Sequence, residues 1–361
     1  RQSWGVQLIE LQKYAENGDE SRIHFNSREG HIPSADELQK LGIKLFVGVG
    51  HETTGATTYA EEDVRNLLEW IDLDPVNHHA VIDATSTLGA MPWAEDIVQQ
   101  VVGKCSLFMP FQKAIGGTAG YFIVSFTPEA LALVEKNVNN PAWAIPRQLK
   151  LALPADGQQP ISGKKSLAAG PFYDPAKEQM IGGIINTFST IAFAETTFGL
   201  LNSEKKVGSV RELNKRSIVN RAEVEQWVAD HPLFALGVED SSRRGAAVTL
   251  LKVNDADVND PEQHARIIAK TKQLLGFEGL THPNGDYEHG LDVARYVNTF
   301  PGTAGDFRLW IGGIRPVSDI SAVFDNLEYA YLRAKIVVLE EELAKDGVTF
   351  EASAAADASV R

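Results

Sequence analysis

The sequence predicts an α/β protein with a mostly parallel sheet flanked by helices, followed by a smaller α+β unit. Between residues 34 and 137, short apolar runs of strand length alternate with segments of helical spacing, which is typical of a parallel sheet covered by helices. A second, shorter alternation begins near residue 234. The 361 residues, 43% hydrophobic and 23% charged, are enough for a large core and for two domains.

Local signals place the helices and strands of the first half. Residues 4–18 have apolar side chains at helical spacing and end on an Asn-Gly pair, which is a helix stop. Ser34 and Glu37 form a capping box at the start of the next predicted helix. Thr127 is the expected N-cap of a later one. The remaining elements are strands over 43–50, 79–85, 105–111 and 121–126, and helices over 60–73, 93–103 and 127–137.

The second half begins with a long helical pattern, from residue 186 to residue 232. The proline- and glycine-rich residues 137–182 before it are predicted to form a long loop, either functional or a plain surface loop. These patterns divide the chain into a large domain (1–200), a small domain (201–345) and a disordered low-complexity tail (346–361). The small domain is predicted to hold strands over 234–239, 245–253 and 306–313, and helices over 261–276 and 318–345.

Composition and charge argue against several classes of function. The net charge is −14 and no lysine/arginine cluster stands out, so neither nucleic acid nor an anionic membrane is the expected partner. No apolar stretch is long enough to span a bilayer. The single cysteine, Cys105, lies in an apolar run and is expected to be a core residue, which fits the cytoplasm or another reducing compartment. His78 and His79 have no accompanying ligand cluster, so no metal site is predicted.

Asp83 and Lys113 are the first candidate site residues. Each follows an apolar strand, and the carboxyl ends of neighbouring parallel strands meet in one crevice, so both side chains are expected there. One interpretation is a plain salt bridge. The other is a pyridoxal phosphate (PLP) site, in which the lysine amine binds the cofactor aldehyde and the carboxylate keeps the pyridine nitrogen protonated. Residue types and spacing allow both.

Six segments in order resemble a known family. They resemble the class V, fold-type-I PLP-dependent aminotransferases, and more narrowly the phosphoserine aminotransferases. The resemblance covers roughly residues 3 to 340. The six segments are "SWGVQLIELQKY", "HETTGA", "VIDATSTLGAMPW", "FMPFQKAIGGTAGYFIVSFTPEAL", "IINTFST" and "FRLWIGGIRP".

The resemblance implies a cofactor site. Lys113 would be the Schiff-base lysine and Asp83 the partner of the pyridine nitrogen. Gln112 would bind the cofactor phosphate, and Thr53 would hydrogen-bond near the ring hydroxyl and the phosphate. Trp4 would stack on the ring. His51 is interpreted as a structural residue and is left outside the site.

The resemblance also implies a homodimer and a reaction. Asn186 and Thr187 would reach the phosphate of the neighbouring subunit's cofactor, so the two active sites would be shared. Arg315 would hold the substrate α-carboxylate, and Arg308 would help to hold the distal phosphate or carboxylate. The implied reaction of serine biosynthesis converts L-glutamate and 3-phosphohydroxypyruvate to O-phosphoserine and 2-oxoglutarate.

Two other functions stay open. The chain could be another class V aminotransferase, acting on alanine, serine or glyoxylate, or a non-catalytic homologue that lost the cofactor. The family's phosphate-binding turn precedes the tryptophan, and only three residues precede Trp4 here. We therefore expect the sequence to be a fragment that lacks the N-terminal part of a full enzyme.

Overall fold

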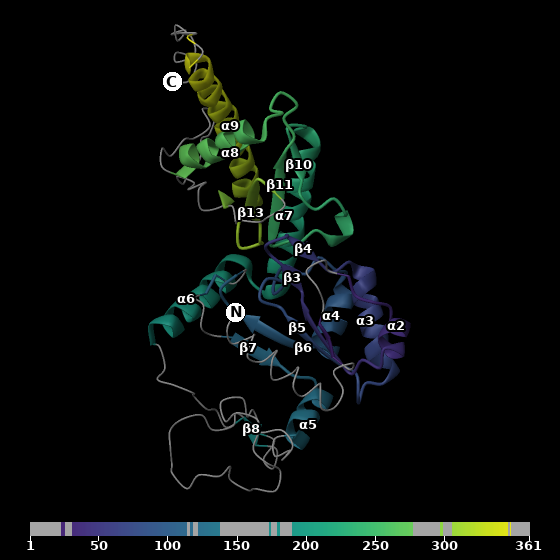
Figure 1. Cartoon of the computed structure of the whole chain (residues 1–361). Coiled ribbons are helices and arrows are strands. Elements are labelled where there is room, and N and C mark those ends of the chain that lie inside the picture. The colour runs from purple at the N-terminus through teal and green to yellow at the C-terminus, as the bar shows by residue number, and fades with distance from the viewer. Residues whose placement is uncertain are drawn as a thin grey trace, which may run out of the picture.

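The computed structural model describes most of the helices and strands that the sequence predicts (Figure 1). The amphipathic segment 4–18, most of the loop 137–182 and most of the tail 346–361 lie outside the described residues. The described residues are 23–25, 31–113, 116–117, 122–137, 173–174, 179–180, 190–276, 297–298, 305–345 and 347.

A five-stranded sheet forms the centre of the first half, in the order β1-β2-β5-β6-β7. Its first four strands are parallel and β7 is antiparallel to β6. The mostly parallel sheet predicted from the sequence is thus confirmed. The strands are β1 (Ile23–Phe25), β2 (Leu45–Val49), β5 (His79–Asp83), β6 (Ser106–Pro110) and β7 (Phe122–Ser125).

Three helices cover one face of this sheet, and they lie together beside it in Figure 1. They are α2 (Ala35–Lys40), α3 (Glu61–Leu73) and α4 (Glu95–Lys104). Phe46, Ile82 and Leu107 point into the core beneath them and are at most 3% exposed. Because side chains alternate along a strand, Asp83 lies on the opposite face from Ile82. The face that carries Asp83 is thus the one that these three helices leave uncovered.

Two sequence predictions about this half are confirmed by contacts. The Ser34 hydroxyl accepts from the Glu37 amide and the Glu37 carboxylate accepts from the Ser34 amide, which completes the capping box of α2. The Thr127 hydroxyl accepts from the Ala130 amide at the start of α5 (Pro128–Asn137). Cys105 is 1% exposed, and burial raises the pKa of its thiol to about 12.

The long helical pattern of the second half is divided into two helices. They are α6 (Thr190–Val207) and α7 (Val210–Asp230). Gly208 separates them with φ = +93°, a conformation that glycine adopts without strain, and the Ser209 side chain then caps α7. The predicted domain limit at residue 200 falls inside α6, and the domain limits stay a prediction.

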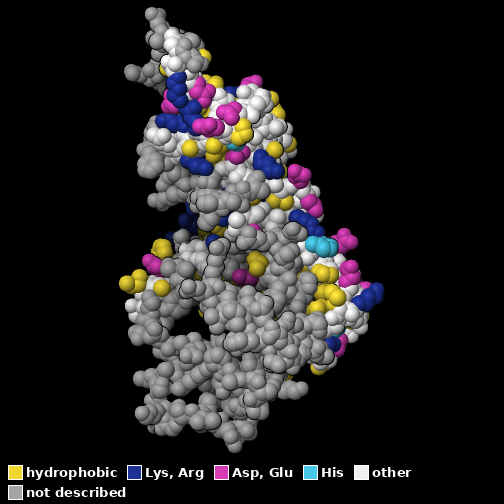
Figure 2. Space-filling view, in the orientation of Figure 1, with side chains coloured by type: hydrophobic (Ala, Val, Ile, Leu, Met, Phe, Trp, Pro, Cys, Tyr) yellow, Lys and Arg dark blue, Asp and Glu magenta, His cyan; other side chains and the backbone are white. Residues whose placement is uncertain are grey.

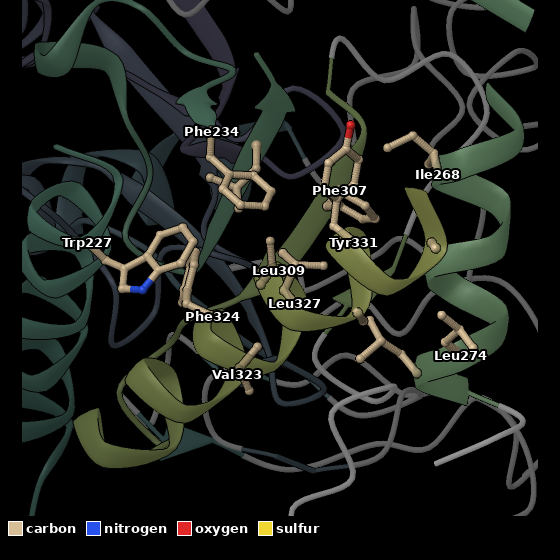
Figure 3. Packing of buried hydrophobic residues seen from close by; sticks show 14 of the residues in the cluster. Trp227, Phe234, Ile268, Leu274, Phe307, Leu309, Val323, Phe324, Leu327 and Tyr331 are labelled. Atoms are coloured by element: carbon tan, nitrogen blue, oxygen red, sulfur yellow. The ribbon is translucent and has the colours of Figure 1, made fainter. Parts of the chain in front are cut away.

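A second, antiparallel sheet follows, in the order β10-β11-β13-β12. The elements of this part are β10 (Phe234–Leu236), β11 (Val248–Val253), β12 (Val297–Asn298), β13 (Phe307–Trp310), α8 (Pro261–Gly276) and α9 (Val317–Lys345). Aromatic and aliphatic side chains from α7, α8, α9 and the strands interlock in its core (Figure 3). Trp227 lies between Phe234 and Phe324, with ring centroids 5.3 and 4.9 Å away.

Replacing Leu327 with alanine is expected to destabilise this core. Leu327 is 0% exposed on α9, and removing its side chain leaves a cavity that costs about 2–5 kcal/mol in the free energy of unfolding. Urea denaturation measures the loss. Leu332→Ala on the same helix is the control, because Leu332 is 44% exposed and the change should cost about 0.5 kcal/mol or less. Equal losses in the two variants would contradict the packing.

Charges of both signs are interspersed on the surface around α8 and α9, at the upper end of the molecule in Figure 2. Arg266 pairs with Glu341 and Glu342 there, with N–O distances of 2.9 and 2.5 Å. Of the helices that the structure describes, none has the length and apolarity needed to cross a membrane.

Candidate active site

The carboxyl ends of the central parallel strands are level with one another. Val49, the last residue of β2, pairs with Asp83, and Asp83 pairs with Phe108 on β6. Ligands of open parallel sheets bind at this edge. The sequence segments that follow these three strand ends therefore start from the same edge, as predicted.

Asp83 is held in one orientation at the end of β5. Its Oδ1 accepts from the backbone amide of Thr85 at 2.9 Å and from the Thr85 hydroxyl. Its own carbonyl accepts from the Gly50 amide at 3.0 Å, which ties the turn to the neighbouring strand end. This Asx turn leaves the half-buried carboxylate with free acceptor capacity on Oδ2.

Lys113 lies on a tight turn after β6. The Gly116 amide donates to the Lys113 carbonyl at 3.0 Å, and the Gly117 amide donates to the Phe111 carbonyl at 2.8 Å. Gly116 has φ = +75°, which a side chain would strain. The turn therefore favours a glycine at position 116, three residues after the lysine.

The Lys113 amine is half-buried and lies over an aromatic ring. Its Nζ is 4.7 Å from the centroid of Trp310 on β13, a cation–π distance. Burial lowers the pKa of Lys113, and the positive charge of Arg308 lowers it further. Among the described residues, the Asp83 carboxylate binds Thr85 and the Lys113 amine lies over Trp310, and no ion pair joins the two.

The guanidinium of Arg308, on β13, lies over the same Trp310 ring. Its guanidinium carbon is 5.7 Å from the Trp310 centroid, and its Nη1 donates to the Thr53 carbonyl at 3.2 Å. Arg308 is 5% exposed, and burial lowers its pKa while the negative charge of Glu52 opposes this shift. Thr53, Lys113 and Arg308 are thus brought together from segments far apart in the sequence.

The Thr53 segment is fixed by its neighbour Glu52. Glu52 is the last residue of β3 (His51–Glu52), which forms a short hairpin with β4 (Thr57–Thr58). Its two carboxylate oxygens accept from the amides of Thr54 and Gly55 at 3.0 and 2.7 Å. This turn presents the Thr53 carbonyl to Arg308.

Gln112 contributes a buried acceptor next to Lys113. Its Oε1 is shielded from solvent and has no hydrogen-bond partner among the described residues. Burying an amide oxygen without a partner is unfavourable, so the position is suited to a ligand that donates a hydrogen bond.

His51 is a buried residue that sequence reasoning left out of the site. It is 2% exposed, and burial lowers its pKa to about 4, against the opposing effects of the Ser86 backbone and Glu52. Neither ring nitrogen makes a hydrogen bond of good geometry with the residues described. A Cβ atom added to Gly245 would lie 2.3 Å from the His51 ring, so the imidazole packs directly against the backbone of Gly245, in the second half of the chain.

Trp310 is a residue near Lys113 that the sequence analysis missed, although a signal for it exists. Arg308 and Trp310 are two residues apart on a strand, so their side chains share one face. An aromatic residue two positions after a candidate substrate arginine, in a predicted strand, indicates a neighbour in the same site. No comparable local signal points to His51.

The other candidates lie on the loop after β13 or outside the described residues. The backbone of Arg315 is held on both sides: its amide donates to the Gly312 carbonyl, and its carbonyl accepts from the Asn220 side chain. Arg315 therefore lies on the loop after β13. Trp4, Asn186 and Thr187 lie outside the described residues.

The architecture resembles solved enzyme structures. Ureidoglycine–glyoxylate aminotransferase from Bacillus subtilis matches with a TM-score of 0.54 and 13% sequence identity, over 86% of this chain and 69% of that one. Alanine–glyoxylate aminotransferase from Nostoc sp. matches with a TM-score of 0.51 and 14% identity, over 83% and 66%. The chain has the fold of a fold-type-I aminotransferase.

The aminotransferase fold was predicted from the sequence, and the match confirms it at the level of architecture. A phosphoserine aminotransferase from Cytophaga hutchinsonii is also similar, with a TM-score of 0.45 and 15% identity over 87% of this chain and 67% of that one. This chain thus spans about two-thirds of the length of these enzymes. The sequence matches no protein-family model and no curated protein.

Proposed function

We propose that the chain transfers amino groups between an amino acid and a 2-oxo acid with PLP as cofactor. The observation that carries the proposal is Lys113: a half-buried amine with a lowered pKa, not paired with Asp83, beside a buried arginine on an aminotransferase fold. A lysine that is deprotonated more easily than an exposed one is a better nucleophile toward an aldehyde.

The residues present fit PLP. Lys113 would hold the cofactor through its amine, and Asp83 would pair with the pyridine nitrogen. The side-chain amide nitrogen of Gln112 would donate to the cofactor phosphate, its buried Oε1 would accept from a donor group, and Thr53 would hydrogen-bond near the ring hydroxyl. When bound, PLP supplies an electron sink for the bond that breaks at the substrate Cα. Trp4 as the stacking residue, and Asn186 and Thr187 as ligands from a second subunit, remain part of the proposal.

Lys113 would also carry the proton. Its amine can take the proton from the substrate Cα and return it to the C4′ atom of the cofactor, provided that it is neutral at the moment of transfer. Burial and the charge of Arg308 both favour the neutral amine. Burial and the charge of Arg308 would therefore favour both roles of Lys113, as nucleophile and as proton carrier.

Arg308 is the arginine that would hold the substrate α-carboxylate. The substrate carboxylate is attached to the Cα that Lys113 must reach, so the arginine that binds it must lie beside Lys113. Arg308 lies over the same Trp310 ring as the lysine amine. The proposal therefore moves the α-carboxylate from Arg315, which the sequence favoured, to Arg308, and leaves the distal group to Arg315.

Replacing Arg308 with glutamine is expected to raise the KM of every amino acid and 2-oxo acid substrate by about 100-fold, the value of one charge-assisted bidentate contact. Arg315→Gln is the matched variant and should raise KM only for substrates with a distal anion. Steady-state kinetics with alanine and with O-phosphoserine measures both effects. An unchanged alanine KM in Arg308→Gln, or a raised one in Arg315→Gln, would contradict the assignment.

Two acceptors are candidates. The sequence resemblance favours 3-phosphohydroxypyruvate with L-glutamate as donor. Glyoxylate is the other candidate, since it has no distal anion and would need only the contact with Arg308. The two solved enzymes with the higher TM-scores are named for glyoxylate as well.

A panel of acceptors tests the function directly. The protein with added PLP is expected to show a visible absorption band, to lose it with borohydride while the label remains on Lys113, and to convert one of the two acceptors with L-glutamate or L-alanine. A protein that stays colourless with PLP would refute the enzyme and favour a non-catalytic homologue. Sedimentation analysis tests the expected homodimer.

A further inference from the structure

A buried polar stripe runs along α7. Asn214, Ser217 and Asn220 are three residues apart, so they lie on one face of the helix. Ser217 is 0% exposed and Asn220 is 1% exposed. Buried polar side chains in a helix are retained where they bind something specific, and here all three bind backbone groups of other segments. We name these three residues the α7 stripe.

One end of the α7 stripe binds the segment that follows Asp83. The Oδ1 of Asn214 accepts from the Met91 amide at 2.5 Å, and its Nδ2 donates to the Met91 carbonyl at 2.9 Å. The Ser217 hydroxyl donates to the Gly89 carbonyl at 2.6 Å. These bonds attach α7 to the first sheet through the chain that leaves β5.

The other end binds the loop that follows Arg308 and Trp310. The Gly313 amide donates to the Ser217 hydroxyl at 2.7 Å. The Nδ2 of Asn220 donates to the Ile311 carbonyl at 2.8 Å and to the Arg315 carbonyl at 3.0 Å. A side chain on Gly313 would start 2.2 Å from a helix carbonyl, so the loop lies directly on the backbone of α7.

Ser217 joins both ends with one hydroxyl. A hydroxyl has one hydrogen to donate and lone pairs to accept with. The Gly89 carbonyl at 2.6 Å is a nearer acceptor for that hydrogen than the Leu213 carbonyl of the same helix at 3.1 Å, and an acceptor position of the hydroxyl binds the Gly313 amide. Replacing Ser217 with alanine would remove both bonds. Asn214 and Asn220, by contrast, each bind only one of the two segments. The stripe is therefore a direct link between the Asp83 segment and the Arg308 strand.

The neighbouring helix supports the same link. A side chain on Gly199 of α6 would start 3.0 Å from the Gly116 carbonyl, so α6 packs against the turn that carries Lys113. Only Gly208 and Ser209 separate α6 from α7. The pair of helices thus touches the segments of Asp83, Lys113 and Arg308.

We propose that the α7 stripe is a positioning element that sets the distance between the Arg308 guanidinium and the Lys113 amine, which we call the reach. The inference rests on the proposed function. A substrate held by its carboxylate presents its Cα to the lysine only if that reach is correct, and displacements of about 1 Å cost as much as 100-fold in rate. The stripe binds the backbone of the segment after Asp83 and of the loop after Arg308, and Asp83 pairs with β6, the strand that leads to Lys113. It would therefore keep the reach constant whatever the substrate side chain.

The test compares three variants with one control. Ser217→Ala removes one contact on each side, Asn214→Ala removes the Met91 contacts on the Asp83 side only, and Asn220→Ala removes the Ile311 and Arg315 contacts on the Arg308 side only. Thr271→Val is the control, because it removes a hydroxyl that is 0% exposed on α8 and bonds within its own helix. Circular dichroism shows which variants fold, and the single-sided variants remain available if Ser217→Ala does not.

The deciding measurement is the pH dependence of Lys113 acetylation by acetic anhydride in the PLP-free protein, followed by mass spectrometry. Arg308 lowers the pKa of Lys113. The buried His51, whose pKa is about 4, is neutral in the alkaline range where a lysine amine loses its proton. If the stripe holds Arg308 in place, cutting it moves the labelling midpoint upward by about half a pH unit. Thr271→Val should leave the midpoint unchanged.

Kinetics of the PLP-loaded protein give the second reading. Each folded stripe variant is expected to raise the KM for the amino acid about tenfold, and Thr271→Val is expected to change it less than about twofold. Unmoved labelling midpoints in all folded stripe variants would overturn the inference, whatever the KM. Labelling needs no cofactor, so its outcome is separate from the acceptor panel, whose failure would refute the proposed function.

Discussion

Replacing Lys113 with alanine is expected to lower kcat by at least about 1000-fold, because the variant loses both the group that would hold the cofactor and the group that would carry the proton. Borohydride should no longer fix PLP to the protein. Absorption spectra and single-turnover assays of the PLP-loaded variant measure the two losses.

Lys272→Ala is the matched control for this experiment. Lys272 on α8 is also a half-buried lysine whose pKa burial lowers, with Asp306 opposing the shift. It lies in the second half of the chain, over a different core. Burial alone, without the surroundings of Lys113, should give no cofactor attachment. Label that moves to Lys272, or a Lys113→Ala protein with ordinary activity, would refute the role of Lys113.

Replacing Asp83 with asparagine is expected to lower kcat/KM by about 100- to 1000-fold while PLP still binds, since an amide cannot stabilise a protonated ring nitrogen as a carboxylate does. Asparagine keeps the oxygen that accepts from Thr85, so the turn should survive. The measurement is the rate of the first half-reaction with L-glutamate.

A cofactor analogue separates charge from structure in the Asp83 variant. PLP methylated on its ring nitrogen carries a permanent positive charge and should restore much of the lost rate in Asp83→Asn. Asp74→Asn at the end of α3, where Asp74 binds the Asn77 side chain, is the control and should keep ordinary kinetics. Absence of rescue together with an intact turn would argue that Asp83 has a different role.

Much of the fold follows from local patterns in the sequence. Apolar alternation and caps such as Ser34 with Glu37 depend on neighbours within a few residues, and the structure agrees with them to within a few positions. The link from Asp83 to Lys113 was also accessible, because parallel strands end at one edge of a sheet. The break between α6 and α7 at Gly208 could not be predicted, because a glycine in a helical pattern can either lie within a helix or end it.

The sequence by itself thus determined the order of helices and strands, the fold class, and a lysine and a carboxylate at neighbouring strand ends, because each depends on the chain within one or two elements. Only the tertiary structure shows that Lys113 and Arg308 lie over the same ring, that of Trp310. It alone put Ser217 between two distant loops. Such contacts depend on how separate sheets and helices pack, and no local pattern encodes that geometry.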